Sequence, residues 1–340
     1  CFKMNNKKVL DFIGKRKILF AIPIVIVAIT IIFNCIFGVQ MAIEFKGGTM
    51  LTYSHIGEID TNAVKKVVES ENYGAVTVTT GSSMNSSLET VEISFSSSEG
   101  LTADKQTALS GKLQEAFKDN DLTLVNSQDV NPTSGTEFFL KCLVAVLFSF
   151  ILLVIYIAFR FKKIGGLSAG VFALVALVHD CVMVYAVFVF CRFPIDANFM
   201  AVVLTVLGNS INNTIVVYDR IRENRNLYGN SLSLKELVNM SITQSITRSV
   251  NTTVTTAFAV LAICVVCAIC GVTSIMTFAI PMMAGLICGT YSSLCISGPL
   301  WVLWQEKHGK NYTNSGKSDD KKDTKNLASN TAIDAKKLMV

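Results

Sequence analysis

The sequence predicts a polytopic α-helical membrane protein with six transmembrane helices and one small α+β domain. Hydrophobic residues make up 51% of the 340 residues and charged residues only 16%, and the mean hydropathy is +0.48. These values exceed what the core of a soluble globular protein requires. Six stretches are apolar over the roughly 20 residues that a helix needs to cross a bilayer. Between the first two stretches lies a segment with strand and helix patterns of its own.

The apolar stretches define the expected spans. The first is too long, and too poor in a small-residue cleavage site, for a removable signal peptide, so we expect a permanent anchor. The other five are expected to form a membrane domain over residues 138–304. The predicted spans are 18–39, 138–159, 166–191, 197–218, 250–271 and 276–303.

Lysine and arginine cluster at one set of span ends, and this asymmetry predicts the orientation. Because such residues accumulate on the cytoplasmic side, we expect the termini, 1–17 and 305–340, inside and residues 40–137 outside. The tail from residue 305, rich in Lys, Asp, Asn and Ser, is typical of a disordered segment. The basic residues that support this orientation are Lys7, Lys8, Lys15, Arg16, Lys17, Arg160, Lys162, Lys163, Arg220, Arg222, Arg225, Lys235 and Arg248.

The outside segment has the pattern of a small α+β domain. Short stretches rich in Val, Ile, Thr and aromatic residues predict four strands, and two amphipathic stretches predict helices, the first beginning at Asp60 or Thr61. Their order is β-α-β-β-α-β, which is typical of a ferredoxin-like domain. The strands are "TMLTYSH", "AVTVTT", "LETVEISFS" and "LTLVNSQDV", and the helices are "DTNAVKKVVESEN" and "TADKQTALSGKLQEAFKD".

Several functions are not supported by any motif. None of the ten cysteines lies within residues 40–137, which excludes a disulfide framework there. "CVVCAIC" (264–270) has a metal-like spacing, but cysteine packs as a small hydrophobe in an apolar helix, so we predict packing and no metal or cofactor. "GKNYTNSGKS" (309–318) has its first glycine too far upstream for a nucleotide-binding loop. Acidic residues outnumber basic ones over residues 40–137, which argues against nucleic acid there.

Polar residues within the spans are the candidates for function, because burying them in a bilayer is costly. His179 and Asp180 lie near the middle of the third span. The alternative for Asp180 is a purely structural pairing with a neighbouring helix. In the fourth span, "LTVLGNSINNTIVVYDRIREN" (204–224) places Asn212 and Asn213 on one polar stripe of helical spacing with Thr205 and Asn209.

Arg248 begins the fifth span at a depth that Asn212 and Asn213 can share. The alternative is an interfacial arginine whose side chain extends to the lipid headgroups. Gly285 and Gly289 form a small-xxx-small pair, which we interpret as helix packing rather than chemistry.

Seven stretches, in order, resemble the SecF family of protein-export membrane proteins over about residues 8–304. Each is weak alone, but their order and spacing together are specific. They are "DFIGKRK" (11–17), "MAIEFKGGTM" (41–50), "DVNPTSG" (129–135), "VHD" (178–180), "GNSINNTIVVYDRIREN" (208–224), "SITQSITRSVNTTVTT" (241–256) and "GLICGTYSS" (285–293).

The resemblance implies a resistance-nodulation-division type membrane domain in the bacterial cytoplasmic membrane, and no enzymatic activity. It implies a heterodimer with a SecD-like subunit, acting beside the SecYEG channel. The complex would use the proton gradient to assist the late translocation of unfolded secretory proteins. Two alternatives stay open: a non-energised membrane scaffold of the translocon, and half of a small-solute exporter, for which the outer domain leaves little room.

The chain departs from the family pattern G-Y-S-I-N-D-T, which has an aspartate where this chain has Asn213 and a tyrosine where it has Asn209. The resemblance gives that aspartate the proton-coupling role. Coupling is therefore expected to lie at Asp180 or in the SecD half, or to be lost. Glu44 stands where the family has aspartate and keeps the charge. The candidate coupling residues are Asp180, His179, Arg248, Asn213 and Asn212.

Overall fold

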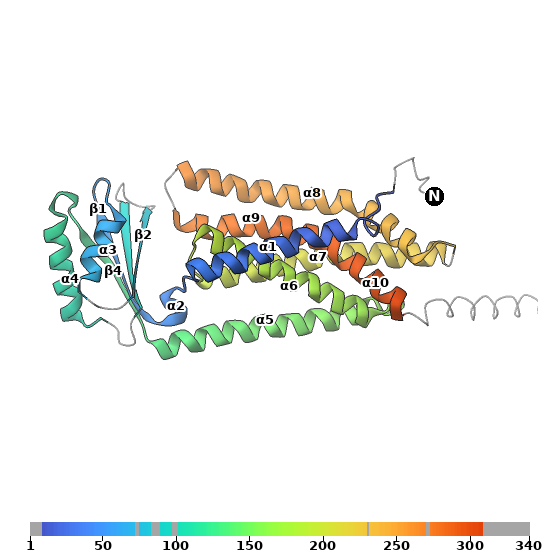
Figure 1. Cartoon of the computed structure of the whole chain (residues 1–340), viewed down its shortest axis with the longest axis horizontal. Helices are drawn as coiled ribbons and strands as arrows, with labels where there is room; N and C mark the ends of the chain where they lie inside the picture. Colours follow the sequence, from blue (N-terminus) through green and yellow to red (C-terminus); the bar gives the residue numbers. More distant parts are fainter. Residues whose placement is uncertain are drawn as a thin grey trace, which may run out of the picture.

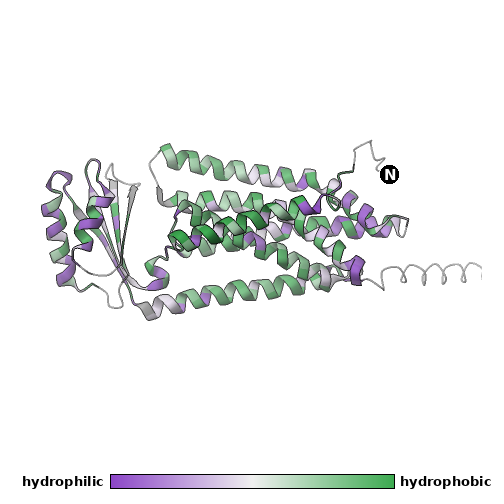
Figure 2. Ribbon diagram, in the orientation of Figure 1, coloured by the Kyte–Doolittle hydropathy of each residue, from purple (hydrophilic) through white to green (hydrophobic). Residues whose placement is uncertain are grey.

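The computed structural model describes residues 9–71, 75–82, 89–96, 101–229, 231–269 and 273–308. A bundle of long helices forms one part, and an α+β domain lies beyond one end of it (Figure 1). Hydrophobic residues run along the bundle, and hydrophilic residues gather in the α+β domain and at the opposite end (Figure 2). This distribution matches a protein that crosses a bilayer.

Among the residues that the structure describes, six helical segments are long and apolar enough to cross a membrane, which confirms the predicted class. The fourth and fifth extend beyond the apolar stretches, because their polar extensions bond to each other through Asn224 Nδ2 and Ser241 Oγ at 2.8 Å. The sixth is interrupted by a π-helical segment, η3. The segments are α1 (Arg16–Phe37), α5 (Pro132–Arg160), α6 (Gly166–Cys191), α7 (Ala197–Tyr228), α8 (Leu234–Ile269), and α9 (Thr273–Ser292) continued by η3 (Ser293–Ser297) and α10 (Gly298–His308).

The α+β domain has the predicted β-α-β-β-α-β order. Its antiparallel sheet has the strand order β2-β3-β1-β4. Asp60 caps the first helix by accepting a hydrogen bond from the backbone N–H of Asn62 at 2.9 Å. Leu51, Ile93 and Leu109 are fully buried in its core. The elements are β1 (Gly48–His55), α3 (Thr61–Glu69), β2 (Ala75–Ser82), β3 (Glu89–Ser96), α4 (Ala103–Ala116) and β4 (Thr123–Val130).

The "MAIEFKGGTM" stretch joins this domain to the bundle. It forms the short helix α2 (Ile43–Lys46), which packs on the beginning of α5. Phe45 is buried and its ring stacks on Phe138, with centroids 5.5 Å apart. A side chain at Gly135 would meet the backbone of this stretch, 3.1 Å from the carbonyl of Glu44. The Glu44 carboxylate accepts from the backbone N–H of Ala197 at 2.9 Å. This side chain, which is longer than an aspartate, therefore links α2 to the first turn of α7.

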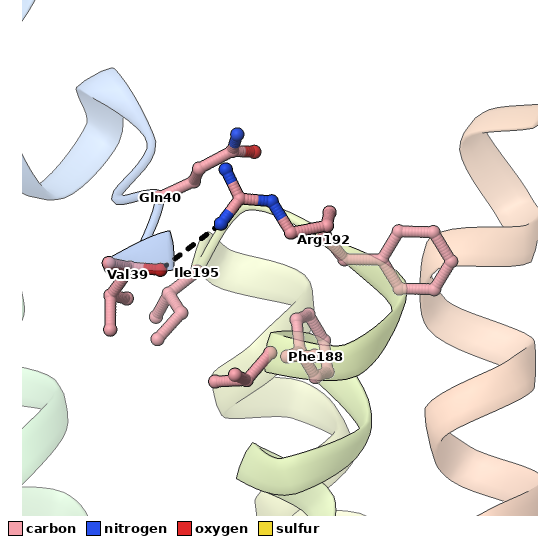
Figure 3. A pocket seen from close by; sticks show the side chains of 8 residues that line it. Val39, Gln40, Phe188, Arg192 and Ile195 are labelled. Atoms are coloured by element: carbon pink, nitrogen blue, oxygen red, sulfur yellow. Dashed lines mark hydrogen bonds between the residues drawn. The ribbon is translucent and has the colours of Figure 1, made fainter. Parts of the chain in front are cut away.

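The loop between α6 and α7 fastens the chain that leaves α1. Arg192 Nη1 donates to the carbonyl oxygens of Phe37 at 2.8 Å and Gly38 at 3.3 Å. The backbone N–H of Ile195 donates to the carbonyl of Gln40 at 2.8 Å. Figure 3 shows Arg192 reaching from this loop toward Gln40 and Val39. These bonds hold the end of α1 against α6 on the side that carries the α+β domain.

The "DFIGKRK" stretch docks on the beginning of α8. Asn239 Oδ1 accepts from the backbone N–H groups of Phe12 and Ile13, both at 3.2 Å, and its Nδ2 donates to Asp11 Oδ1 at 2.9 Å. The backbone N–H of Gly14 donates to the same carboxylate oxygen at 2.8 Å, and Ile13 is buried. The hydrogen bonds from Gly14 and Asn239 lower the pKa of Asp11.

We expect Asn239→Ala to release residues 9–14 from α8, because two backbone N–H groups lose their acceptor. In the wild type, the hydrogen bonds to the ionised Asp11 stabilise the docked segment. This stabilisation is present above the ordinary pKa of an aspartate and is lost as the pH falls through the lowered pKa of the folded state. Hydrogen–deuterium exchange of residues 12 and 13 measures the release. Asn226→Ala, at an exposed position of α7, is the control. Unchanged protection in Asn239→Ala would contradict this role.

Candidate functional site

Asp180 lies at the centre of a buried polar cluster between α6, α7 and α9. Its side chain is fully buried. Carboxylate Oδ2 accepts from Ser210 Oγ at 2.5 Å and from Ser292 Oγ at 2.8 Å, and Oδ1 lies 3.0 Å from His179 Nδ1. A carboxylate in an apolar interior is tolerated only where hydrogen bonds of this kind replace water. The cluster therefore holds one carboxyl group inside the bundle, with hydrogen-bond partners on α7 and α9.

The π-helical segment and Gly289 shape the cluster. The carbonyl oxygen of Gly289 accepts from Ser293 Oγ at 2.8 Å and from Ser292 Oγ at 3.0 Å. Ser293 Oγ shares its one proton between this carbonyl and the carbonyl of Ser210, which is 3.0 Å away and ties η3 to α7. A π-helical turn shifts the helix face, and such turns occur often at functional sites. Here the turn begins where two serines face Asp180 and α7.

Asn213 lies about one helical turn after Ser210 on α7, in the same polar interior. It is 2% exposed, and its Nδ2 donates to Thr290 Oγ1 at 3.2 Å. Thr290 is in turn hydrogen-bonded to Thr253 of α8 through their hydroxyl groups. Thr214 Oγ1 donates to Ser293 Oγ at 2.9 Å. The cluster therefore consists of two hydrogen-bonded sets that adjoin along α7 and α9, one around Asp180 and one of Asn213, Thr290 and Thr253.

The structure brings some of the candidate residues together and separates others. Asp180, His179 and Asn213 belong to the cluster. Asn212 and Arg248 are exposed on the surface of the bundle, and no hydrogen bond joins Arg248 to Asn213 within the described residues. The sequence predicted the depth of Arg248 from its position along the helix. Its side chain lies on the face of α8 that points away from the cluster.

Sequence reasoning missed most of the hydroxyl groups that line the site. Serine and threonine are common in transmembrane helices, where they bond to the carbonyl four residues earlier, so single residues carry little signal. The stronger signal was the paired serine in "GLICGTYSS", which lies in α9 and η3. The missed residues are Ser210, Thr214, Thr253, Thr290, Ser292 and Ser293.

A second polar surface lies on the outside of the bundle. On α8, Asn251, Thr252 and Thr255 are exposed near Arg248, and on α7 Asn212 is exposed. This surface, which we call the outer polar face, lies at the level of the cluster, because Thr253 of α8 contacts Thr290 inside. The hydroxyl groups of Thr252 and Thr255 bond to carbonyl oxygens of their own helix, so the cost of facing lipid tails falls on Arg248, Asn251 and Asn212, whose side chains indicate contact with another protein or with a wet cavity.

The cysteines of "CVVCAIC" that the structure describes are buried. Cys264 packs in an apolar cluster with Val260, Ala279 and Leu286. Cys267 is also buried, and Cys270 lies outside the described residues. In the part of the chain that the structure describes, no group of three His, Cys, Asp or Glu residues could hold a metal ion.

Gly285 and Gly289 allow α9 to approach α6 and α7. An added Cβ at Gly289 would lie 3.1 Å from Ser210 Cβ and 3.6 Å from Asp180 Oδ2. At Gly285 it would lie only 2.5 Å from Val206 Cγ2 and 2.9 Å from Val184 Cγ2. The two glycines therefore set the spacing in which Asp180 meets its serine partners.

We expect Gly285→Ala to destabilise the bundle by about 1–3 kcal/mol, because the added methyl group overpacks two valines. Thermal unfolding in detergent measures the loss. Gly208→Ala is the matched control, since a Cβ there meets nothing within 4 Å. An equal effect of both substitutions would show that close approach at Gly285 is unimportant.

In the described part of the chain, six membrane-length helices, a buried polar cluster around one acid and one α+β domain define the class: a polytopic α-helical membrane protein with a small α+β domain. The family model of the protein export membrane protein SecD/SecF, C-terminal, matches residues 110–307. The chain belongs to the SecD/SecF family of protein-export membrane proteins.

Two relatives illustrate the similarity. The chain is 30% identical over 312 residues to protein translocase subunit SecF of Anaerolinea thermophila, covering 90% of this chain and 98% of that protein. It is 31% identical over 302 residues to protein translocase subunit SecDF of Bacillus subtilis, covering 88% of this chain but 39% of SecDF. The chain therefore spans nearly the whole length of that SecF and about two fifths of that SecDF.

A solved structure has the same fold. The crystal structure of SecDF, a translocon-associated membrane protein from Thermus thermophilus, superposes with a TM-score of 0.74 at 26% sequence identity. The match covers 90% of this chain and 40% of that chain. The similarity includes the bundle and the α+β domain, since neither alone could account for such coverage.

Proposed function

We propose that the chain is the SecF-type half of a SecDF complex that uses the proton gradient to assist Sec-dependent translocation. The observation that carries the proposal is Asp180, a fully buried acid with serine partners on two other helices. An ionisable group inside a membrane bundle is a feature of proton relays. Protonation would change the bonds to Ser210 and Ser292 and so bias the packing of α6, α7 and α9. The role is transport without chemical catalysis.

A SecD-like subunit is the proposed partner. The outer polar face would otherwise meet lipid, and this chain matches only about two fifths of a fused SecDF. Half of a pseudo-symmetric transporter buries such a face against its other half. We further propose that the complex acts beside the SecYEG channel on unfolded secretory proteins.

The proposed location is the bacterial cytoplasmic membrane, with both termini inside and residues 40–137 outside. Lys162 follows α5, Arg220 lies in the polar extension of α7 and Lys235 lies in the first turn of α8. Figure 2 shows hydrophilic residues at the end of the bundle opposite the α+β domain, where these segments meet, which fits this orientation by the positive-inside rule. In a cysteine-free background, a cysteine at Asn62 should be labelled by an impermeant thiol reagent from outside. A cysteine at Ser233 should be labelled only after permeabilisation. Labelling of that cysteine in intact cells would show that the orientation is the opposite of the one proposed.

The test of the function is the release of a stalled secretory protein from membrane vesicles. Vesicles would contain the translocon, the SecD-like subunit and this chain. We expect the chain to stimulate release, and an uncoupler of the proton gradient to remove that stimulation. Stimulation that persists in the uncoupler would refute gradient use.

A non-energised scaffold is the second candidate, and Asn213 favours it. The family pattern has an acid there, whereas an asparagine cannot titrate. A scaffold would need this chain for assembly with the SecD-like subunit and would act equally with and without the gradient. A small-solute exporter has less support, because the hydroxyl groups of the cluster bond directly to one another and to Asp180.

A further inference from the structure

A groove opens between the end of α5, the beginning of α6 and α10, at the end of the bundle opposite the α+β domain. Its volume is about 740 Å³. Phe159 and Leu167 line one wall and are 67% and 71% exposed. These side chains belong to membrane-spanning helices, so in a bilayer they face acyl chains. The groove therefore adjoins lipid along its apolar wall.

The rim of the groove is polar and carries positive charge. Lys162 lies on it, with Nζ 4.7 Å from the centre of the Phe159 ring. On the opposite side, Trp304 stacks on His308, with ring centroids 5.2 Å apart. The lining includes no acidic residue among those the structure describes. The nearest acid on α10, Glu306, is paired with Lys235 at 3.2 Å.

The first turn of α6 also borders the groove. Gly165, in a left-handed conformation with φ 83°, is the N-cap, and no side chain caps this turn. Ser168 Oγ donates to the carbonyl of Gly165 and accepts from Trp301 and Gln305, so it is fully used. Gly166 is buried against the backbone of Ala158, so the positive end of the dipole of this 26-residue helix meets the groove through the turn of Leu167 and Ser168, which has no side-chain cap.

We propose that this groove binds an anionic phospholipid of the surrounding bilayer. The phosphate lies between Lys162 and the first turn of α6, where an ammonium group and helix N–H groups both favour an anion. The acyl chains run along Phe159 and Leu167. Trp304 occupies the headgroup level, where tryptophan is favoured. The proposal requires only that the chain spans a bilayer, so it stands or falls separately from a role in protein export.

The two tryptophans of the chain make the proposal testable by fluorescence. Trp304 is 40% exposed and lines the groove, whereas Trp301 is fully buried. The full chain is reconstituted in phosphatidylcholine vesicles that contain increasing fractions of either dibrominated phosphatidylglycerol or dibrominated phosphatidylcholine. One basic residue near the phosphate should favour the anionic lipid roughly fivefold. We therefore expect half-maximal quenching of Trp304 at a roughly fivefold lower fraction of dibrominated phosphatidylglycerol than of dibrominated phosphatidylcholine. Trp304→Phe should abolish the difference.

Two lysine variants separate a specific site from general attraction. Lys162→Gln should remove the preference for phosphatidylglycerol. Lys162 and Lys141 are both exposed, so neither substitution endangers folding. Lys141→Gln is the matched control, because Lys141 lies on the same helix at its other end with its side chain 76% exposed. This variant should keep the preference.

Four outcomes would overturn the proposal. Equal quenching by both lipids would remove the preference, and an unchanged preference in Lys162→Gln would remove the site. Loss of the preference on adding inorganic phosphate would identify a soluble anion as the ligand. If quenching appears in a chain truncated after His308 but not in the full chain, the C-terminal segment is the occupant of the groove.

Discussion

Replacing Asp180 with asparagine should lower gradient-dependent release of a stalled secretory protein on the order of tenfold, within the range of ordinary coupling free energies. Asparagine has nearly the same size and keeps one carbonyl oxygen. Ser210 and Ser292 both donate to the same oxygen, Oδ2, so the amide oxygen can accept both bonds. What the substitution removes is the exchangeable charge. Assembly with the SecD-like subunit should therefore stay within about twofold of wild type, because the packing is preserved.

The measurement compares release with and without a proton gradient, together with the yield of the complex in a co-purification. Asp196→Asn is the matched control. Asp196 caps α7 from a partly buried position outside the cluster, and asparagine caps a helix equally well. Equal losses of release and of assembly in Asp180→Asn would favour the scaffold. Unchanged release would place coupling outside this chain.

The fold could be predicted from the sequence because its signals are local. Six apolar stretches and alternating strand patterns follow directly from the cost of burying polar groups in lipid and from the geometry of strands. The helix ends were less predictable. Polar residues after Tyr218 and before 250 continue α7 and α8, because bonds such as Asn224 to Ser241 satisfy them outside the apolar stretch. No periodicity within one segment contains that information.

The site was only partly predictable, and the asparagines of α7 show why. Thr205, Asn209 and Asn212 follow one helical stripe, of which Thr205 and Asn212 are exposed and Asn209 is partly buried, whereas Asn213 is buried in the interior. Adjacent residues differ by about 100° around a helix, so both asparagines of the pair cannot share a face. Which of them is buried depends on where α9 packs, and that depends on Gly285 and Gly289.

Asn213→Asp should make the stability of the bundle depend on pH. Asn213 is 2% exposed, and its amide donates to Thr290. A protonated acid can donate to Thr290 in the same way. The ionised acid cannot, and Arg248 is exposed, with no hydrogen bond to this position among the described residues. Burial disfavours the charge, so the variant should match wild type at low pH and lose stability as the pH rises, by on the order of 3 kcal/mol.

Thermal unfolding from pH 4 to pH 8 measures this effect; these limits are approximate and bracket ordinary carboxyl titration. Asn226→Asp is the matched control on the same helix, at an exposed position near its polar end. That variant should show no new pH dependence. A pH-independent Asn213→Asp would mean that the acid finds a cation or water that the packing of the single chain does not provide.

The same variant distinguishes relocated coupling from lost coupling. Moving one charge through the membrane potential yields about 2.3 kcal/mol per 100 mV, enough to bias a modest conformational change. We propose that coupling lies at Asp180 or in the SecD-like half, since Asp180 keeps its serine and histidine partners. Wild-type release should then depend on the gradient, and Asn213→Asp should change it by less than about twofold near neutral pH, because burial keeps most of the new acid uncharged. If wild-type release ignores the gradient and Asn213→Asp confers dependence on it, coupling was lost at this position and the chain is a scaffold.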